Sequence, residues 1–224
     1  MTFNRRGFAM KPVGHFNFFA PMLFSGRTLL KLTLMFAVVA LGSGCKQPES
    51  QQSFQSTDVT GANFARDFHL VDHQGRQRSL SDFKGKVVVL FFGYIHCPDI
   101  CPTTLAELAS VMERIGPDSD KVQVLFATLD PERDTPAILA KFVPSFHPQF
   151  IGLYGTPEVI AKTAEEYKLV YKKQPGKHPD NYTLDHSAGT YIYDPAGRLR
   201  LYASYGQGVD TLVEDIKILL KASN

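Results

Sequence analysis

The chain has 224 residues and a mass of 24.9 kDa, with 44% hydrophobic and 21% charged residues, which suffices for one ordinary core but not for several. The formal charge of +2 hides an asymmetry, because residues 1–44 hold five basic side chains and no acidic one. The remaining 180 residues carry 19 basic against 22 acidic side chains, a net charge of −3. This excludes nucleic acid as a partner, since phosphate binding needs clustered Lys and Arg. Three cysteines are too few for a disulfide-stapled scaffold.

The N-terminal region is predicted to be an export signal. Residues 32–41 (LTLMFAVVAL) form an apolar run of about ten residues, shorter than the ~20 needed to span a bilayer. Small residues then lead into Cys45 and resemble the lipobox of bacterial lipoproteins, which implies lipid attachment at Cys45 and membrane anchoring. Leu41 stands one position further from the cysteine than that pattern usually has it. An ordinary signal or an uncleaved anchor, with Cys45 incidental, remains the alternative.

Three regions follow from this reading of the N-terminus. Residues 1–44 are the signal region, which starts at Met1 or at Met22, and residues 5–8 with Lys11 loosely resemble a twin-arginine export motif. Residues 45–57 are polar and form a flexible tether. Residues 58–224 form the folded domain. We expect a bacterial envelope protein, anchored to the membrane and facing the periplasm.

The folded domain alternates strand-like and helix-like segments. In chain order we expect a hairpin from residues 68–71 and 77–80, a buried strand at 86–93, a helix at 102–115, a second buried strand at 122–129, helices at 135–142 and 157–167, strands at 169–172, 190–193 and 199–205, and a final helix at 209–220. Residues 172–182 show no periodicity and are expected to be a mobile loop. The order predicts an α/β fold: a thioredoxin-like central sheet flanked by helices, with an N-terminal hairpin.

The segment GYIHCPDICP, residues 93–102, lies where the first buried strand leads into the first long helix. A thiol at a helix start faces free backbone N–H groups, which favour the thiolate and lower its pKa. Cys97 and Cys101 are four residues apart, with prolines limiting the backbone, so both sulfurs can reach one side of the turn. They can then close a disulfide or bind one metal ion.

Two thiolates favour a soft metal such as Cu⁺, and a nitrogen ligand would complete a trigonal site that also supports Cu²⁺. His186 is the candidate nitrogen, because it precedes the strand at 190–193 and can arrive beside the first strand–helix turn. The weaker candidates are His96, whose side chain should point away from Cys97, and the histidines in loops or in the hairpin (His69, His73, His147 and His178).

At these residues the chain resembles the Sco/SenC family of copper proteins, which serve cytochrome oxidase assembly. The family pattern is G-Y-T-x-C-P-D-x-C-P, then D-P-x-R-D-T-P, then D-H-[ST] before a strand. This chain matches it with residues 93–102, 130–136 and 185–187, in the same order, within a resemblance that covers residues 58–222. The departure is Ile95, where the family usually has Thr, and it removes a hydroxyl but no ligand.

The resemblance implies that Cys97, Cys101 and His186 bind one copper ion per chain, as Cu⁺ or Cu²⁺. It places the acidic loop of the family at Asp130 without giving its role; physically, a nearby carboxylate could orient His186 or keep positive charge close. Asp185 could do the same or merely cap a loop. Asp99 is a turn residue on this reading.

Two functions from different classes compete. The first is a membrane-tethered copper chaperone that delivers copper outside the cytoplasm to the copper-site subunit of cytochrome c oxidase. The second is a thiol–disulfide oxidoreductase in which Cys97 and Cys101 keep the cysteines of a copper site or another partner reduced. Other copper carriers or thiol reductases are further partners of either. A peroxidase is disfavoured, because Pro98 stands where peroxiredoxins place a threonine.

Overall fold

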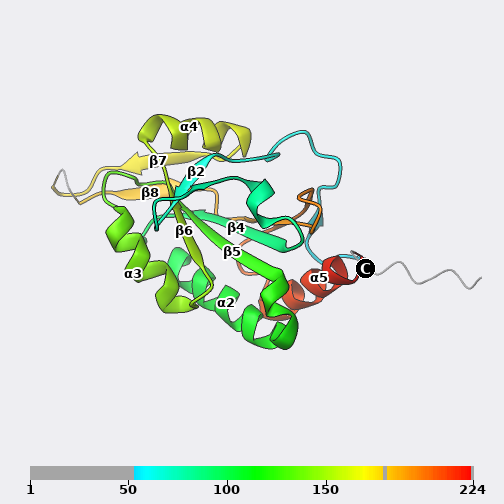
Figure 1. The fold of residues 1–224 in the computed structure, drawn as a ribbon. Coiled ribbons are helices and arrows are strands. Elements are labelled where there is room, and N and C mark those ends of the chain that lie inside the picture. The colour runs from blue at the N-terminus through cyan, green and yellow to red at the C-terminus, as the bar shows by residue number, and fades with distance from the viewer. Residues whose placement is uncertain (1–52, 179–180, 223–224) are drawn as a thin grey trace, which may run out of the picture. The chain divides into compact units, whose positions relative to one another are not determined.

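A computed structural model describes residues 53–178 and 181–222, so the signal region and Cys45 lie outside the described residues (Figure 1). The main sheet has eight strands in the order β1-β10-β9-β4-β5-β6-β2-β3, and a separate hairpin pairs β7 with β8. The strands are β1 (Thr57–Asp58), β2 (Leu70–Asp72), β3 (Gln77–Arg78), β4 (Val87–Gly93), β5 (Val122–Thr128), β6 (Ile151–Tyr154), β7 (Tyr171–Gln174), β8 (Thr183–His186), β9 (Thr190–Tyr193) and β10 (Leu199–Ala203).

The two central strands have no residue exposed to solvent. β4 and β5 run parallel in register from Val87↔Val122 to Gly93↔Thr128, and all their residues are buried. β9 pairs antiparallel with the other edge of β4. The unbroken apolar runs predicted strands covered on both faces, and this prediction is confirmed.

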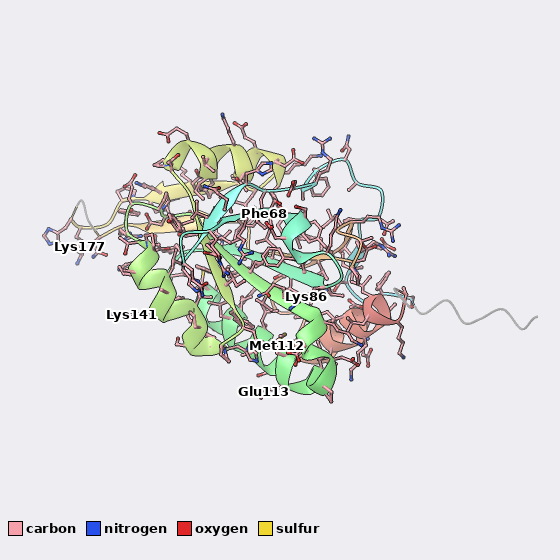
Figure 2. All side chains as sticks on the ribbon, in the orientation of Figure 1. Phe68, Lys86, Met112, Glu113, Lys141 and Lys177 are labelled. Carbon is pink, nitrogen blue, oxygen red and sulfur yellow. The ribbon has the colours of Figure 1, made fainter. Side chains whose placement is uncertain are left out.

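In the part of the chain that the structure describes, four α-helices cover the sheet: α2 (Ile100–Ile115), α3 (Pro136–Phe146), α4 (Pro157–Glu166) and α5 (Val209–Lys221). Short 3₁₀ helices, η1 (Leu80–Phe83) and η2 (Gly116–Lys121), connect elements. Figure 1 shows α4 on one side of the sheet and α2, α3 and α5 on the other. In Figure 2, Met112 is buried on α2 while Glu113 and Lys141 extend into solvent, the amphipathic arrangement that the helical spacing predicted.

Two hairpins of the sheet share one sequence pattern, D-x-x-G-R-x-R. In the β2–β3 hairpin, Asp72 accepts the backbone N–H groups of Gln74 and Arg76 and the Nε–H groups of Arg76 and Arg78, all at 2.9–3.0 Å. In the turn between β9 and β10, Asp194 accepts the N–H groups of residues 196 and 198 and the side chains of Arg198 and Arg200. A buried carboxylate with this many donors fixes each turn, and the expected N-terminal hairpin is confirmed.

Four parts of the observed fold differ from the sequence predictions. β6 and β8 were not expected, since β6 depends on pairing with β5 and β2, and β8 depends on pairing with β7. Within the expected loop at 172–182, the strand β7 continues to Gln174, where it pairs with β8. Residues 55 and 56, assigned to the tether, are bonded to Asp215 of α5 and belong to the fold.

In the described parts of the chain, residues 53–178 and 181–222, no helix combines the length and apolar character that crossing a bilayer requires.

Candidate metal centre

The two cysteines lie at the junction of β4 and α2. The cysteine loop (residues 94–99) leaves the carboxyl end of β4, and α2 begins at Ile100, two residues earlier than predicted. Cys101 is therefore fully buried in the first turn of the helix, while Cys97 in the loop is half-buried. Both are free thiols, and the Cys101 N–H points to the Cys97 Sγ at 3.5 Å.

Gly93 lets the sulfur of Cys101 approach the end of β4. A Cβ at this position would lie 2.8 Å from the Cys101 Sγ and 2.9 Å from the ring of Phe126. Real Cβ atoms do not approach other atoms this closely, so only glycine fits without movement of the thiol or the ring. This requirement explains why the motif begins with glycine.

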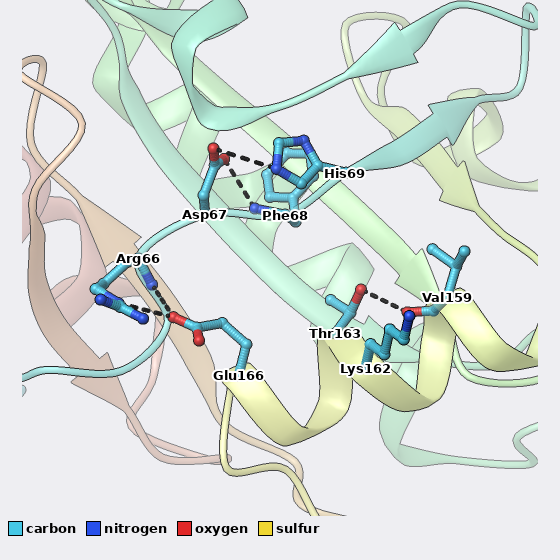
Figure 3. A pocket seen from close by; sticks show the side chains of 8 residues that line it. All are labelled: Arg66, Asp67, Phe68, His69, Val159, Lys162, Thr163 and Glu166. Carbon is cyan, nitrogen blue, oxygen red and sulfur yellow. Dashed lines mark hydrogen bonds and ion pairs between the residues drawn. The ribbon is translucent and has the colours of Figure 1, made fainter.

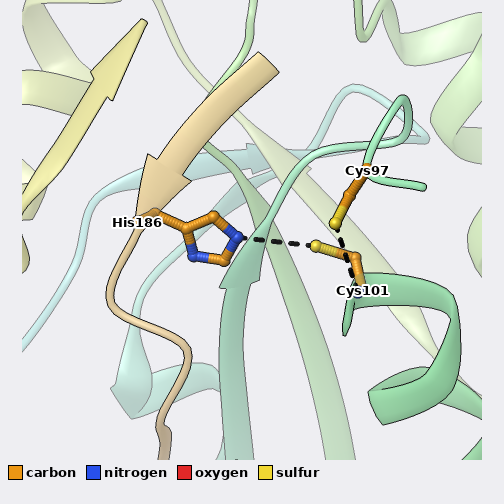
Figure 4. A group of neighbouring side chains, drawn as sticks. All are labelled: Cys97, Cys101 and His186. Atoms are coloured by element: carbon orange, nitrogen blue, oxygen red, sulfur yellow. Dashed lines mark hydrogen bonds between the residues drawn. The ribbon is translucent and has the colours of Figure 1, made fainter. Parts of the chain in front are cut away.

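His186, the last residue of β8, comes to the same place from a segment 85 residues further along the chain. Its Nε2 lies 3.6 Å from the Cys101 Sγ. Figure 4 shows the imidazole pointing toward that sulfur. Its Nδ1 lies 2.9 Å from the Ser187 carbonyl oxygen. Because a carbonyl only accepts, the proton sits on Nδ1, and the lone pair of Nε2 faces the sulfurs.

The ligand atoms of Cys97, Cys101 and His186 all lie within 4.8 Å of one another, the one such group of metal-binding side chains in the described residues. The rings of Phe91 and Tyr94 lie 6.4 and 5.9 Å from the imidazole, centroid to centroid, so the wall behind the histidine is aromatic. Two sulfurs and one nitrogen with no fixed fourth group form a donor set suited to a soft ion.

Burial controls the protonation of the site in the absence of metal. Burial raises the pKa of the Cys101 thiol far above its usual value, and this outweighs the favourable backbone contact near Tyr94. The prediction that the helix start lowers the pKa is therefore wrong for Cys101, because desolvation of the thiolate exceeds the effect of the helix N-terminus. Burial lowers the pKa of the His186 imidazole, which keeps it neutral. A metal would have to displace a thiol proton but no imidazole proton.

The two acidic residues proposed near the ligands occupy different environments. Asp130 is buried, and its carboxylate accepts the Arg133 Nε–H at 2.5 Å and the Tyr182 hydroxyl at 2.7 Å rather than contacting His186. Asp185 is exposed and accepts the Gln174 side-chain amide. Asp99 stands at the N-cap position of α2.

His96 is half-exposed and turned away from the cluster, as expected. Its Nδ1 lies 3.8 Å from a carboxylate oxygen of Asp134. The other oxygen of Asp134 accepts the backbone N–H of Ile95 at 3.0 Å, so this buried acid holds the cysteine loop.

Four residues beside the site had no role predicted from the sequence. Tyr94 lies against His186, Asp134 is bonded to the cysteine loop, and Arg133 contacts Tyr182. Tyr94, Arg133 and Asp134 lie inside the matched motifs, and this position was the only sequence signal that pointed to them. Tyr182 lies in the segment expected to be a loop, and no local pattern distinguishes it.

A hollow with a volume of about 480 Å³ lies away from the cysteines, between α4 and the segment preceding β2 (Figure 3). Two ion pairs lie among its lining residues, Arg66 with Glu166 and His69 with Asp67. It contains no thiol, so the candidate chemistry of the described residues stays at the cysteine loop.

A thioredoxin-like sheet that brings two cysteines of a strand–helix turn to a distant histidine defines a class of thiol and metal-binding proteins. A family model described as SCO1/SenC matches residues 56–221, and the chain belongs to that family.

Individual relatives agree with this assignment. The mitochondrial protein SCO2 homolog of Bos taurus is 40% identical over 153 residues, which are 67% of this chain and 58% of the bovine protein; the match thus covers less than two thirds of that relative. The copper-bound structure of ScoI from Bradyrhizobium japonicum is 40% identical, with a TM-score of 0.65 over 71% of this chain and all of that one. The solution structure of apo Sco1 from Thermus thermophilus is 38% identical, with a TM-score of 0.68 over 76% of this chain and 99% of that one.

Proposed function

We propose that this chain is a copper chaperone that binds one copper ion through Cys97, Cys101 and His186. We further propose that it delivers the ion to the copper-site subunit of cytochrome c oxidase during assembly. The observation that carries the proposal is the convergence of three ligand atoms within 4.8 Å from two distant segments. Copper bound to a relative with 40% identity supports it.

The donor set suits a carrier better than a permanent metal site. Three ligands leave a coordination position through which a thiol of an acceptor could bind before the ion leaves. Of the two cysteines, Cys97 in the loop is half-buried whereas Cys101 is fully buried, so an acceptor would meet Cys97 before Cys101. Copper, as cargo, would thus be bound by all three ligands, and an acceptor would approach it from the side of Cys97.

The cellular setting belongs to the same proposal. Residues 1–44 would direct export, and the polar segment from Cys45 up to the start of the folded domain near residue 55 would tether that domain to the membrane, with a lipid on Cys45. The folded domain would face the periplasm of a bacterial envelope. The basic, acid-free N-terminal region and its apolar run support this arrangement.

Copper transfer tests the proposal directly. The full chain loaded with Cu⁺ should pass the ion to the purified, metal-free copper-binding domain of the oxidase subunit. Cys97→Ala should lose stoichiometric binding and transfer, whereas His96→Ala, which alters a neighbouring imidazole outside the cluster, should retain both. Full binding by the Cys97→Ala chain would overturn the assignment.

The reductase role is the second candidate, favoured by the proximity of two free thiols in the cysteine loop and α2. In that reaction the Cys97 thiolate would attack a partner disulfide, Cys101 would resolve the mixed disulfide, and the partner would leave with two thiols while this chain keeps a disulfide. Disulfide reduction at an unchanged rate with a copper chelator present supports this role. Failure to reduce the oxidised oxidase domain would remove it.

A further inference from the structure

The β7–β8 hairpin carries His186 but does not belong to the main sheet. It forms a two-stranded sheet of its own, with Tyr171 opposite His186. A two-stranded hairpin is marginally stable alone, so its position depends on side-chain contacts with the rest of the domain. Those contacts decide whether the imidazole faces the sulfurs.

One set of these contacts comes from the bridging loop, residues 130–134, which connects β5 to α3, beside the packing of Leu184 in the core. The Arg133 guanidinium lies over the Tyr182 ring, with its Cζ 3.5 Å from the centroid, and its Nη1–H donates to the Tyr182 carbonyl at 3.0 Å. The Tyr182 hydroxyl donates to Asp130 at 2.7 Å, and Asp130 also accepts the Arg133 Nε–H. Tyr182 stands four residues before His186 and directly before Thr183, the first residue of β8. The contacts among Asp130, Arg133 and Tyr182, called the clamp below, therefore hold the start of β8.

The last residue of the bridging loop, Asp134, is bonded to the cysteine loop. Asp134 accepts the Ile95 N–H at 3.0 Å and the Thr128 hydroxyl at 2.5 Å, and the Leu129 N–H donates to the Gly93 carbonyl at 2.7 Å. The bridging loop is thus bonded both to the cysteine loop, through Asp134, and to the histidine hairpin, through Asp130 and Arg133.

The Asp130–Arg133 pair of the clamp is largely shielded from solvent. The Asp130 side chain is inaccessible to solvent and that of Arg133 is 17% exposed. A charge-assisted pair in such a place is stronger than a surface pair and costly to break, and a guanidinium stacked on a ring adds to it. By contrast, the neighbouring pair of Lys173 with Glu132 is exposed and contributes little.

We propose that Tyr182, clamped by Arg133 and Asp130, is the positioning residue that holds His186 against the two sulfurs. Loosening the clamp releases the hairpin and converts the three-ligand cluster into a two-thiol one. This inference rests on the proposed copper function only in the second test below, which measures Cu⁺ affinity. The clamp holds the hairpin in the metal-free protein as well.

The first test uses the metal-free full chain. Tyr182→Leu removes both the ring and the hydroxyl, and Tyr182→Phe removes the hydroxyl alone. Amide hydrogen exchange in residues 183–187 should quicken about tenfold in the leucine variant and less in the phenylalanine variant, with α2 unchanged. Thr183→Ala, an exposed change on the same strand, is the matched control and should leave exchange as in the parent. Equal exchange in parent and leucine variant would overturn the proposal.

The second test is a double-mutant cycle on Cu⁺ affinity with His186→Ala. In the parent, losing the imidazole should weaken binding about tenfold or more. In the Tyr182→Leu background the same change should matter less than threefold, because the ring is already displaced. The same factor in both backgrounds would refute the positioning role. If no variant and not even the parent bound copper, the proposed copper function would be refuted. The hydrogen-exchange test would still show whether the clamp holds the hairpin.

Discussion

Single residues with little chemistry of their own set the geometry of the cysteine pair. Gly93 is the clearest case, because the carboxyl end of β4, the Cys101 sulfur and the Phe126 ring meet where its side chain would be. Its role follows from packing and not from a turn. The metal centre therefore depends on a residue that could never be a ligand.

Gly93→Ala should cost about 1–3 kcal/mol of unfolding free energy by overpacking, and it should weaken copper binding by displacing the Cys101 sulfur. Urea unfolding and a Cu⁺ competition titration measure the two effects. Gly197→Ala is the control: its φ of +78° makes the change costly, with no neighbouring atom near the new Cβ and no contact with the site. Unchanged copper affinity in Gly93→Ala would show that the close approach is unimportant.

A second residue-scale prediction concerns acid stability. Burial opposes ionisation of Asp72, but hydrogen bonds from Arg76, Arg78 and Gln74 outweigh it and lower the pKa to about 2. A carboxyl whose folded pKa is depressed stabilises the fold above its unfolded pKa near 4, and this contribution disappears as the pH falls towards 2.

Asp72→Asn should therefore lose about 2 kcal/mol at pH 7 and approach the parent in stability near pH 2. Urea unfolding at several pH values measures the difference. Asp118→Asn, which removes an exposed ion pair with Lys121, should change stability by less than about 1 kcal/mol throughout. A difference between Asp72→Asn and the parent that does not vary with pH would contradict the assignment.

At the scale of elements, helix α5 binds the first residues of the folded domain, Gln55 and Ser56. The carboxylate of Asp215, buried in α5, accepts the backbone N–H groups of Gln55 and Ser56 at 2.8 Å each, and β1 then pairs with β10. The chain segment that leads to the proposed tether is thereby attached to a helix of the core.

Asp215→Asn should destabilise the domain by about 1–3 kcal/mol, since an amide can accept only through one oxygen and leaves a buried N–H without a partner. Hydrogen exchange should quicken at residues 55–58 and stay unchanged at 183–187. Asp210→Asn, at an exposed position of the same helix, is the control. Faster exchange at the hairpin would show that the two ends are coupled, contrary to expectation.

Elements with a strong pattern of their own could be predicted from the sequence, and elements that depend on a neighbour could not. The apolar runs of β4 and β5 and the spacing in α2 identified the central layer, and the three motifs identified Cys97, Cys101 and His186 as candidates. β6, β8 and the role of Tyr182 arise from pairing and from contacts between distant segments. The pKa of Cys101 was wrongly expected to fall, because its burial is a property of the packed molecule.

At the scale of the whole molecule, the fold assembles one cluster from two segments and stiffens it with a third. The cysteine loop leaves the central strand, the hairpin lies outside the main sheet, and the bridging loop is bonded to both. The described domain thus presents its sulfurs and imidazole at the carboxyl end of β4, where the proposed acceptor would approach.

The coordination of copper by the loaded chain tests the central claim most directly. X-ray absorption at the copper edge should show two sulfur neighbours and one nitrogen neighbour, with the nitrogen contribution lost in His186→Ala and one sulfur lost in Cys97→Ala. A first shell of nitrogen and oxygen alone, or a spectrum unchanged by both substitutions, would contradict the account.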